Sequence, residues 1–539
     1  MSGFKPDYNI QTYGFGMDSS DILEGILEAR KIEDTMHFFN PSLDDLLDSD
    51  ELPDMQKGID ILCAAIDNDV HVYLSVDSDT DGITSGAIMY RWLRHRGVTQ
   101  IDYFVSRGKH HGLCQELADD VIAKGADLLI VMDSLDSSAD FYQQIRQNGI
   151  EILVLDHHDI DAGIPYRDYV TLVSSFETAN PFLSGAGVVW KICCETDKVY
   201  DDDYCFENLS DLAATGLVAD MMDMSQDYME TRFIVSHGLD NQRNTAIKKI
   251  IKSYPFTSKS IGYSVAPLVN ASCRYFKNEL AFKAFISDDE KQIKALIKEM
   301  MACREQQNED VEYFMDLNMD VLSKQNDWPY NFIVIDTEFG ICGLIANKIK
   351  AMTGKPVFVV VKREGRYEGS GRGVHGNLRE ITHEITPSAF GKGHPSAFGF
   401  GLDIEEYELF HEAICKALEG MEPEPINVDC ELTHQEIDYG LVNGAKEIER
   451  LAGNGFPYIR FLIRDAGIEL EISKNGRHLY FVNPDGFYYI QWNGASQIGK
   501  YDDYMGGEIC FTGSLDIQYA GGSRKPVLIV EDVWAQEEF

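Results

Sequence analysis

The sequence predicts a multidomain α/β protein whose first third is organised around a parallel β-sheet. Three short apolar segments carry this prediction: HVYLSV at 71–76, DLLIVM at 127–132 and EILVL at 151–155. Each contains β-branched residues, is too short for a typical helix, and is separated from the next by a stretch with helical periodicity. Strands that alternate with helices form βαβ units, so we expect these strands to pair in parallel.

Length and composition agree with a multidomain globular protein. The 539 residues exceed the usual size of one hydrophobic core, and the chain is 44% hydrophobic and 25% charged. No window approaches 18 consecutive apolar residues, and the first twenty residues lack the basic and apolar regions of a signal peptide. The 11 cysteines are scattered without a CxxC pair, which is typical of reduced thiols. We therefore expect a cytoplasmic protein.

The later elements follow in order along the chain. Residues from about 285 to 325 are polar, favour a helix and contain neither Gly nor Pro, so they predict a helical connector. A second α/β segment then begins at NFIVIDTEFG, and a Pro-rich linker follows it at 420–425. Short strands after residue 452 predict a small β-barrel. The expected domains are an N-terminal segment with the parallel-sheet domain at 1–280, the connector at 281–328, the second α/β domain at 329–420 and the barrel at 426–539.

Acidic residues follow all three predicted strands. Asp77 follows the first strand, Asp133 the second and Asp156 the third. Because the carboxyl ends of parallel strands line one edge of a sheet, these side chains should converge. Three carboxylates at one edge would repel one another unless a cation lay between them, so the pattern favours a metal site.

The densest motif is DSDTDG, in which Asp77, Asp79 and Asp81 alternate before Gly82. Alternate carboxylates at a tight turn can offer two oxygens to a hard divalent ion, although a solvated turn would have the same residues. A calcium loop of the EF-hand type is excluded, because its twelfth position is Ile88 rather than Glu and a strand precedes it.

A second motif places His157 and His158 directly after Asp156. A single histidine is more often structural, but two imidazoles beside strand-end carboxylates make a mixed ligand set suited to pairs of Mn²⁺ or Mg²⁺ ions. Asp220 lies in the apolar segment LAATGLVADMMDM, where a carboxylate is costly unless it is paired or bound to metal. The residues alone thus favour a site for a pair of divalent metal ions.

These motifs resemble the DHH phosphoesterase superfamily, and the rest of the chain resembles its RecJ branch of single-strand DNA-specific exonucleases. The four metal motifs are similar to DSDTDG, VMDS, LDHH and GLVAD here. SGAGVVWK, APLVNASCR, GSGRG and GKGHPSAFGFGL resemble further family elements, and the closing strands ICFTGSLDI and PVLIVEDV resemble its terminal OB-type barrel. The resemblance implies a parallel-sheet DHH domain, a helical connector, an α/β DHHA1 substrate-binding domain and an OB-like C-terminal domain.

The resemblance also implies roles for individual residues. Asp133 would bridge two ions, His158 would face the substrate phosphate, Asp81 would brace its turn and Asp156 would orient a neighbouring histidine. The implied metal ligands are Asp77, Asp79, Asp133, His157 and Asp220, and the implied catalytic residues are Asp133, His157 and His158. The implied substrate-binding residues are Asn270, Arg274, Arg372, Gly393 and His394. For each basic residue an ordinary surface ion pair is an equally good interpretation.

The function implied is hydrolysis of single-stranded DNA by two Mn²⁺ or Mg²⁺ ions, from one end and in the 5′ to 3′ direction, during repair, recombination or replication. A helicase or single-strand-binding protein would deliver the strand. The net charge of -42 argues against loose coating of DNA, because proteins that track a polyanion usually have a basic surface. The alternatives are a DHH phosphodiesterase for short oligonucleotides or cyclic dinucleotides, and a non-catalytic DHH scaffold in a replication assembly.

Some residues depart from the family pattern. Asp136 adds a carboxylate near the second metal motif, Lys392 stands where paired glycines begin, and RGKHHGL at 107–113 matches only part of an Arg and Gly-Tyr-Gly pattern. Aromatic residues in the barrel could stack on bases or fill its core. They are Phe481, Phe487, Tyr488 and Tyr489.

Overall fold

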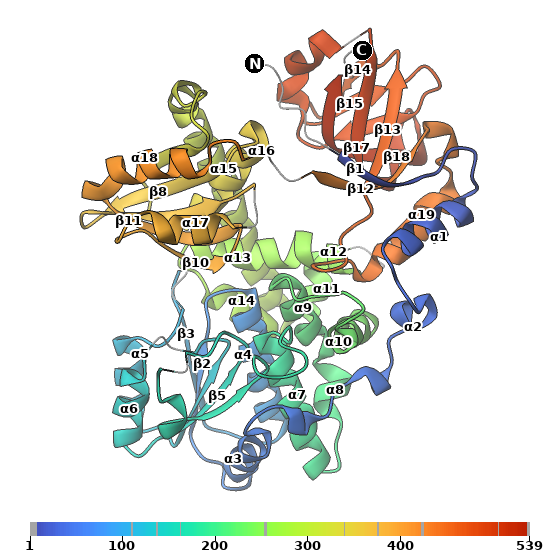
Figure 1. The fold of residues 1–539 in the computed structure, drawn as a ribbon. Helices are drawn as coiled ribbons and strands as arrows, with labels where there is room; N and C mark the ends of the chain where they lie inside the picture. Colours follow the sequence, from blue (N-terminus) through green and yellow to red (C-terminus); the bar gives the residue numbers. More distant parts are fainter. Residues whose placement is uncertain are drawn as a thin grey trace. The chain divides into compact units, whose positions relative to one another are not determined.

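A computed structural model describes residues 8–535, apart from 109–110, 136–137, 162, 253–255, 339, 375–376, 422–424 and 505. The chain forms two compact units. One contains residues 36–309 and 450–457, and the other contains residues up to 35, 310–449 and 458–539. Figure 1 shows both units coloured along the sequence.

The first unit contains a five-stranded parallel sheet, as the sequence predicts, with the order β3-β2-β4-β5-β6. Its pairings are all parallel. The strands are β2 (Val72–Val76), β3 (Ile101–Val105), β4 (Leu128–Met132), β5 (Glu151–Asp156) and β6 (Thr171–Ser174). β2 and β4 are buried along their whole length, which explains why they are almost entirely apolar instead of alternating.

Helices cover both faces of this sheet (Figure 1). On one face α5 (Gln115–Lys124) and α6 (Asp140–Gln147) pack against residues such as Val131 and Val154. On the other, α4 (Thr80–His95) lies so close that a Cβ added at Gly86 would meet the Val76 side chain at 2.7 Å. α7 (Gly185–Val199) and α9 (Ser210–Ala219) pack beside α4. The strand-end acids lie at the carboxyl edge of this sheet.

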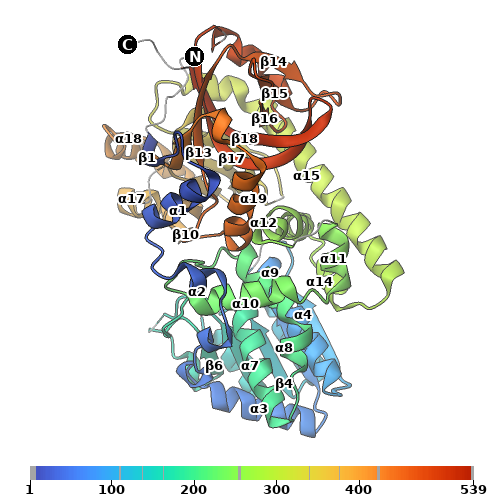
Figure 2. The ribbon, with the colours of Figure 1, turned by 90° about the vertical axis from the view of Figure 1, so that its right-hand side faces the viewer.

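The remaining helices of this unit complete the layer around α4, α7 and α9. They are α2 (Thr35–Phe39), α3 (Met55–Asp67), α8 (Tyr204–Asn208), α10 (Met229–Asp240), α11 (Thr245–Ile251), α12 (Ser258–Ser260), α13 (Ala266–Arg274) and α14 (Glu279–Ile286). The expected connector is confirmed as α15 (Glu290–Lys324), one continuous helix of 35 residues that passes from this unit into the other (Figure 2).

The second unit contains a five-stranded sheet that corresponds to the expected second α/β domain. Its order is β10-β11-β9-β8-β7, antiparallel except for the parallel pair β7 and β8. The strands are β7 (Asn331–Ile335), β8 (Val357–Arg363), β9 (Arg366–Arg372), β10 (Phe390–His394) and β11 (Ala397–Asp403). α16 (Cys342–Thr353) packs on one face, and α17 (Leu378–Ile385) and α18 (Tyr407–Ala417) pack on the other.

The second unit also contains an eight-stranded sheet with the order β1-β12-β13-β17-β18-β16-β15-β14. Most of it comes from the C-terminal strands that the sequence predicts, and α1 (Ser19–Ala29) and α19 (Tyr439–Ile448) pack together beside it. The pairings run in one linear order from β1 to β14, so closure into an OB-like barrel stays a prediction. The strands are β1 (Tyr8–Tyr13), β12 (Ile426–Leu432), β13 (Phe461–Ala466), β14 (Glu469–Ile472), β15 (Leu479–Val482), β16 (Tyr488–Gln491), β17 (Glu508–Ala520) and β18 (Ser523–Ala535).

The N-terminal strand lies outside the sheet of the DHH-like domain. β1 pairs in parallel with β12, so it joins the C-terminal strands although the sequence analysis groups residues 1–280 together. The bounds of the four expected domains therefore stay predictions. The aromatic residues considered for base stacking, Phe481, Phe487, Tyr488 and Tyr489, are all buried, so they serve the core.

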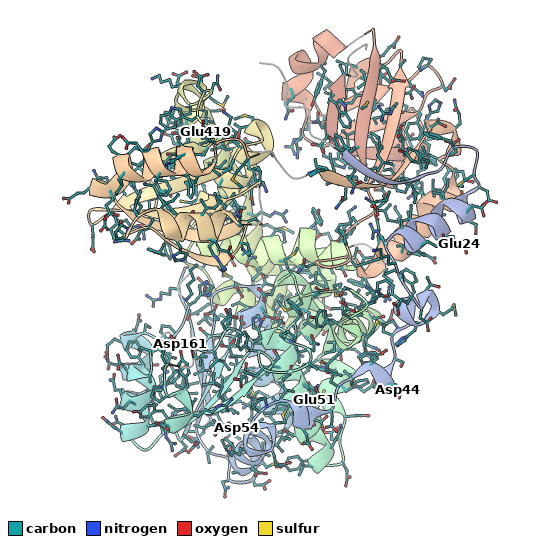
Figure 3. All side chains as sticks on the ribbon, viewed as in Figure 1. Glu24, Asp44, Glu51, Asp54, Asp161 and Glu419 are labelled. Atoms are coloured by element: carbon teal, nitrogen blue, oxygen red, sulfur yellow. The ribbon has the colours of Figure 1, made fainter. Side chains whose placement is uncertain are left out.

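Acidic side chains are spread over the surface of both units (Figure 3). Glu24, Asp161 and Glu419, for example, are exposed on segments far apart in the sequence. No helix in the part of the chain that the structure describes is long and apolar enough to cross a membrane.

Candidate metal centre

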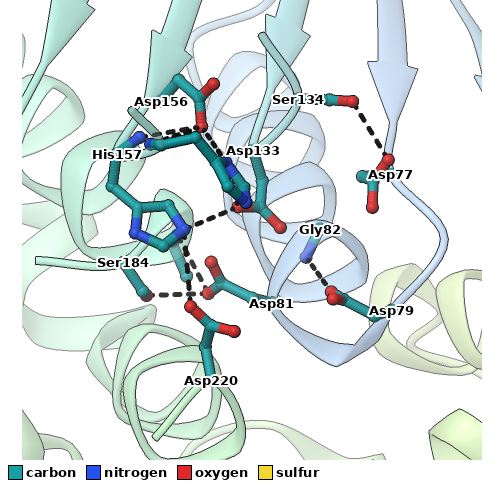
Figure 4. Close-up of polar contacts among 12 residues, drawn as sticks. Asp77, Asp79, Asp81, Gly82, Asp133, Ser134, Asp156, His157, Ser184 and Asp220 are labelled. Carbon is teal, nitrogen blue, oxygen red and sulfur yellow. Dashed lines mark hydrogen bonds and ion pairs between the residues drawn. The ribbon is translucent and has the colours of Figure 1, made fainter. Parts of the chain in front are cut away.

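The strand-end acids converge at the carboxyl edge of the parallel sheet, as predicted (Figure 4). Asp77 follows β2, Asp133 follows β4 and Asp156 ends β5, and these residues are only 1–3% exposed. His157 lies beside them, with its Nε2 3.2 Å from Asp133 Oδ1 and 3.4 Å from Asp220 Oδ2. Four separate segments thus supply the ligand types that the sequence predicts.

The turn after β2 is shaped by the start of α4. Asp79 is the N-cap of this helix, and its side chain accepts a hydrogen bond from the backbone N–H of Gly82 at 3.1 Å. A Cβ at Gly82 would lie 2.5 Å from the Cβ of Asp77, so only glycine lets the helix begin this close to the strand end. The positive end of the helix dipole also favours carboxylates here.

Asp133 is held in an unusual conformation. Its φ of 58° is in the left-handed region, which costs free energy in a residue with a side chain and tends to occur at functional sites. The first residue of α7, Gly185, comes so close that an added Cβ would lie 2.5 Å from Asp133 Cβ and 2.7 Å from its Oδ1. Tight packing therefore fixes the position of the carboxylate expected to bridge two ions.

Asp81 is fully enclosed beneath this edge. Its Oδ1 accepts hydrogen bonds from the Ser184 hydroxyl at 2.7 Å and the Ala186 N–H at 3.1 Å, which agrees with a bracing role. Its Oδ2 is buried without a hydrogen-bond partner among the described residues. Burial and the charge of Asp79 raise the pKa of Asp81 to about 6. One carboxylate oxygen of Asp81 also lies within 4.8 Å of one ligand atom each of His157 and Asp220, and the sequence motifs do not predict this group.

Asp156 orients the second histidine. Its Oδ1 accepts hydrogen bonds from the backbone N–H of His157 and from Nδ1 of the His158 ring, both at 2.8 Å, and its Oδ2 accepts the N–H of Leu135 at 2.5 Å. Burial opposes the charge on His158, but the hydrogen bond and charge of Asp156 outweigh it and raise the pKa of His158 to about 9. His158 is therefore an imidazolium at neutral pH, and its side chain is about half exposed.

His157, in contrast to His158, has an uncharged ring. Burial, reinforced by the charge of His158, lowers the pKa of His157 to about 4, so its ring is neutral at physiological pH. Its Nε2 is buried without a hydrogen-bond partner among the described residues, and so is Oδ1 of Asp133. A neutral imidazole nitrogen is a ready metal ligand.

The donor set fits divalent cations. Burial and mutual repulsion raise the pKa of both Asp133 and Asp220 well above the ordinary range. Buried carboxylates that repel one another are stabilised by a bound cation, and carboxylate and imidazole ligands suit Mn²⁺ and Mg²⁺. Within the described residues, three groups of side chains have ligand atoms within 4.8 Å of one another, and all lie at this edge. They are Asp133 with Asp156, His157 and His158; Asp77 with Asp79 and His111; and Asp81 with His157 and Asp220.

His111 is a site residue that the sequence analysis did not identify. Its Nδ1 lies 2.6 Å from Oδ2 of Asp77, while the other oxygen of Asp77 accepts a hydrogen bond from the Ser134 hydroxyl at 3.1 Å. The only signal in the sequence was the departure of RGKHHGL from the family pattern. Asp136, the additional carboxylate near the second metal motif, lies outside the described residues.

The implied substrate-binding residues divide between the two units. Asn270 and Arg274 lie on α13 in the first unit, where Asn270 accepts a hydrogen bond from the Thr80 hydroxyl at 3.1 Å and Arg274 donates one to Gln307 at 3.0 Å. Three others lie on the mixed sheet of the second unit. They are Arg372 at the end of β9, Gly393 with a φ of 123° in β10, and His394, whose side chain is outside the described set.

Comparisons with known proteins show what the chain is similar to. Residues 69–217 match the DHH family, N-terminal domain. YorK of Bacillus subtilis is 25% identical over 452 residues, covering 76% of this chain and 77% of YorK. The single-stranded-DNA-specific exonuclease RecJ of Haemophilus influenzae is 23% identical over 484 residues, covering 82% of this chain and 83% of that protein. The crystal structure of Thermus thermophilus RecJ in complex with Mn²⁺ has a similar fold, with a TM-score of 0.77 at 20% identity over 99% of this chain and 80% of that one.

The matched segment contains all five strands of the parallel sheet, the DSDTDG turn and the two adjacent histidines. The relatives extend the likeness through α15 and beyond it. Residues 69–217 thus match the DHH family, and the chain as a whole is similar to RecJ exonucleases in sequence and in fold.

Proposed function

We propose that this protein is a metal-dependent exonuclease that hydrolyses the phosphodiester bonds of single-stranded DNA. The observation that carries the proposal is the convergence of three candidate ligand groups at one sheet edge. Every ligand position implied by the family motifs is filled, which a non-catalytic scaffold would not require. The relatives in Haemophilus influenzae and Escherichia coli are both named single-stranded-DNA-specific exonucleases, which supports this substrate.

In this proposal the sheet edge would hold two divalent cations, Mn²⁺ or Mg²⁺, and Asp133 would be a ligand shared by the two. Bound there, they would supply Lewis acidity that polarises the phosphodiester and lowers the pKa of a water molecule. The ligands would be Asp77, Asp79, Asp133, His157 and Asp220.

The protein side chains have complementary tasks. The ring of His157 stays neutral and keeps Nε2 available as a ligand, because its pKa is about 4. The imidazolium of His158, held by Asp156, is exposed enough to donate a hydrogen bond to a phosphate oxygen of the substrate. Asp81 fixes the start of α7 through Ser184 and Ala186 and thereby holds Gly185 against Asp133.

Substrate recognition would use few contacts. Arginine binds phosphate with two parallel hydrogen bonds, and a glycine-rich strand lets backbone N–H groups approach an anion. We propose Asn270, Arg274, Arg372, Gly393 and His394 for this role. Cleavage in the 5′ to 3′ direction, a part in DNA repair, recombination or replication, delivery by a helicase or single-strand-binding protein, and a cytoplasmic location belong to the same proposal.

The test is an end-labelled nuclease assay with single-stranded DNA, duplex DNA, RNA and short oligonucleotides, each with Mn²⁺, Mg²⁺ or EDTA. We expect metal-dependent release of nucleotides from single-stranded DNA, beginning at the 5′ end. The Asp133→Asn variant, which keeps the shape of the side chain but loses its charge, serves as the inactive control. Cleavage of di- or trinucleotides alone would instead support the oligonucleotide phosphodiesterase, and no cleavage of any substrate by metal-loaded protein would support the scaffold.

A further inference from the structure

His111 occupies a position from which it can reach a metal ion. It lies between β3 and α5, and its Nδ1 is 2.6 Å from Oδ2 of Asp77. Asp77 is 2% exposed, whereas the side chain of His111 is about half exposed. The imidazole therefore covers a buried carboxylate from the solvent side.

Other histidines of the chain also pair with carboxylates, so the pairing alone does not define a site. His37 lies 2.6 Å from Asp45, and its side chain is about as exposed as that of His111. The difference is the second carboxylate. A ring nitrogen of His111 and one oxygen each of Asp77 and Asp79 lie within 4.8 Å of one another, and among the described residues His37 belongs to no such group.

The surroundings of this trio also point to a cation. The hydroxyl of Ser134, the residue after Asp133, donates a hydrogen bond to Oδ1 of Asp77 at 3.1 Å, so the trio lies near the residue expected to bridge two ions. Oδ1 of Asp133 is buried and has no hydrogen-bond partner among the described residues. The trio shares no residue with the group formed by Asp81, His157 and Asp220, so the two groups can hold separate ions.

We propose that His111 is an additional nitrogen ligand of the ion that Asp77 and Asp79 bind. The inference deepens the proposed function, on which it rests. Each ion would then have one imidazole, His111 for one and His157 for the other. Imidazole favours transition metals, whereas carboxylate and water ligands suit Mg²⁺, so His111 shifts the preference of the site toward Mn²⁺.

The experiment measures metal binding directly, without DNA. Isothermal titration of Mn²⁺ and of Mg²⁺ into metal-free protein is compared between the wild type and His111→Gln. The glutamine amide can still donate a hydrogen bond to Asp77 but offers no imidazole nitrogen. We expect one of the two Mn²⁺ affinities to fall by about 10- to 100-fold, the range typical for loss of a group that supports a metal site, and Mg²⁺ affinity to fall less.

Pulsed electron paramagnetic resonance of the Mn²⁺-loaded protein gives a second measurement. Coupling to ¹⁴N should report imidazole on both ions in the wild type and on one ion in His111→Gln. The matched control is His37→Gln, which removes a histidine with the same distance to its carboxylate and should leave Mn²⁺ binding and the ¹⁴N signal unchanged.

The outcomes separate this inference from the proposed function. If His111→Gln binds Mn²⁺ and Mg²⁺ as the wild type does and keeps the full ¹⁴N signal, His111 is not a ligand, whether or not the protein is a nuclease. If His111→Ala loses affinity but His111→Gln restores it, the histidine only positions Asp77, and the ligand assignment is overturned. If the wild type binds no divalent ion, both the ligand assignment of His111 and the proposed function are wrong.

Discussion

Replacing Gly185 with alanine should disable the metal centre without changing any proposed ligand. The added Cβ would lie 2.5 Å from Asp133 Cβ, 2.7 Å from its Oδ1 and 2.8 Å from its Cγ. Carbon atoms in contact are normally about 3.5 Å or more apart, so the aspartate or the start of α7 must move by about 1 Å. A displacement of that size in a catalytic group costs about 100-fold in rate, and overpacking costs about 1–3 kcal/mol of stability.

The assay combines three measurements on Gly185→Ala: turnover of single-stranded DNA, Mn²⁺ affinity by titration calorimetry, and the free energy of unfolding in urea. Gly25→Ala is the matched control, because a Cβ at Gly25 in α1 meets nothing within 4 Å. We expect the control to match the wild type in turnover and metal affinity. Gly185→Ala protein that is folded and binds Mn²⁺ normally, with turnover within about twofold of wild type, would refute the claim that this contact positions Asp133.

Four further predictions follow from the site and its surroundings. Asp133→Ala should abolish hydrolysis while the protein stays folded, and more than a few per cent of wild-type turnover would reject Asp133 as the bridging ligand. Blunt duplex DNA should be degraded much more slowly than single strands, because unpairing costs free energy that the site does not supply; equal rates in the end-label assay would contradict this. If three or four phosphates are contacted, the logarithm of the affinity for single strands should fall with the logarithm of the salt concentration, with a slope of about -2 to -3. Arg372→Ala should flatten this slope by about 0.7. A steep slope for the wild type, or an unchanged slope for the variant, would place the binding groove elsewhere. Burial raises the pKa of Asp211 from 3.8 to about 6, so its contribution to stability is present below pH 4 and is lost as the pH rises past 6. Between pH 4 and 6 the free energy of unfolding of the wild type should therefore fall by up to about 3 kcal/mol relative to that of Asp211→Asn. Urea unfolding in EDTA would measure this difference, and parallel pH profiles of the two proteins would contradict the prediction.

The convergence of Asp77, Asp133 and Asp156 could be predicted because it depends on topology alone. Once three apolar strands alternate with helices, the strands must be parallel, and their carboxyl ends must share one edge. Topology could not predict which of Asp79 and Asp81 binds metal and which braces the turn, because the spacing of the motif does not show which side chain points inward beneath α7. That choice depends on the close approach of Gly216, where an added Cβ would lie 2.2 Å from Asp81 Oδ1.

Other features could not be predicted from local sequence patterns. His111 reaches Asp77 through the path of an irregular segment, and neither periodicity nor a turn motif specifies that path. The family pattern also offered no histidine there to compare. The buried positions of Phe481 and Tyr489 illustrate a related difficulty, because an aromatic residue in a predicted strand suits a core and a binding surface equally well until the pairing of the strands is known.

The pairing of β1 with β12 has a consequence for synthesis of the chain. Asn9 and Asn427, which are partners across this pair, are separated by 418 residues. At about 5–20 residues per second, a ribosome needs roughly 20–80 s to make the second strand after the first. Residues 36–309 can fold during that interval, while β1 waits without its partner. Because β1 lies at the edge of its sheet, a shortened protein that lacks it would leave β12 as the new edge, open to pairing with another molecule.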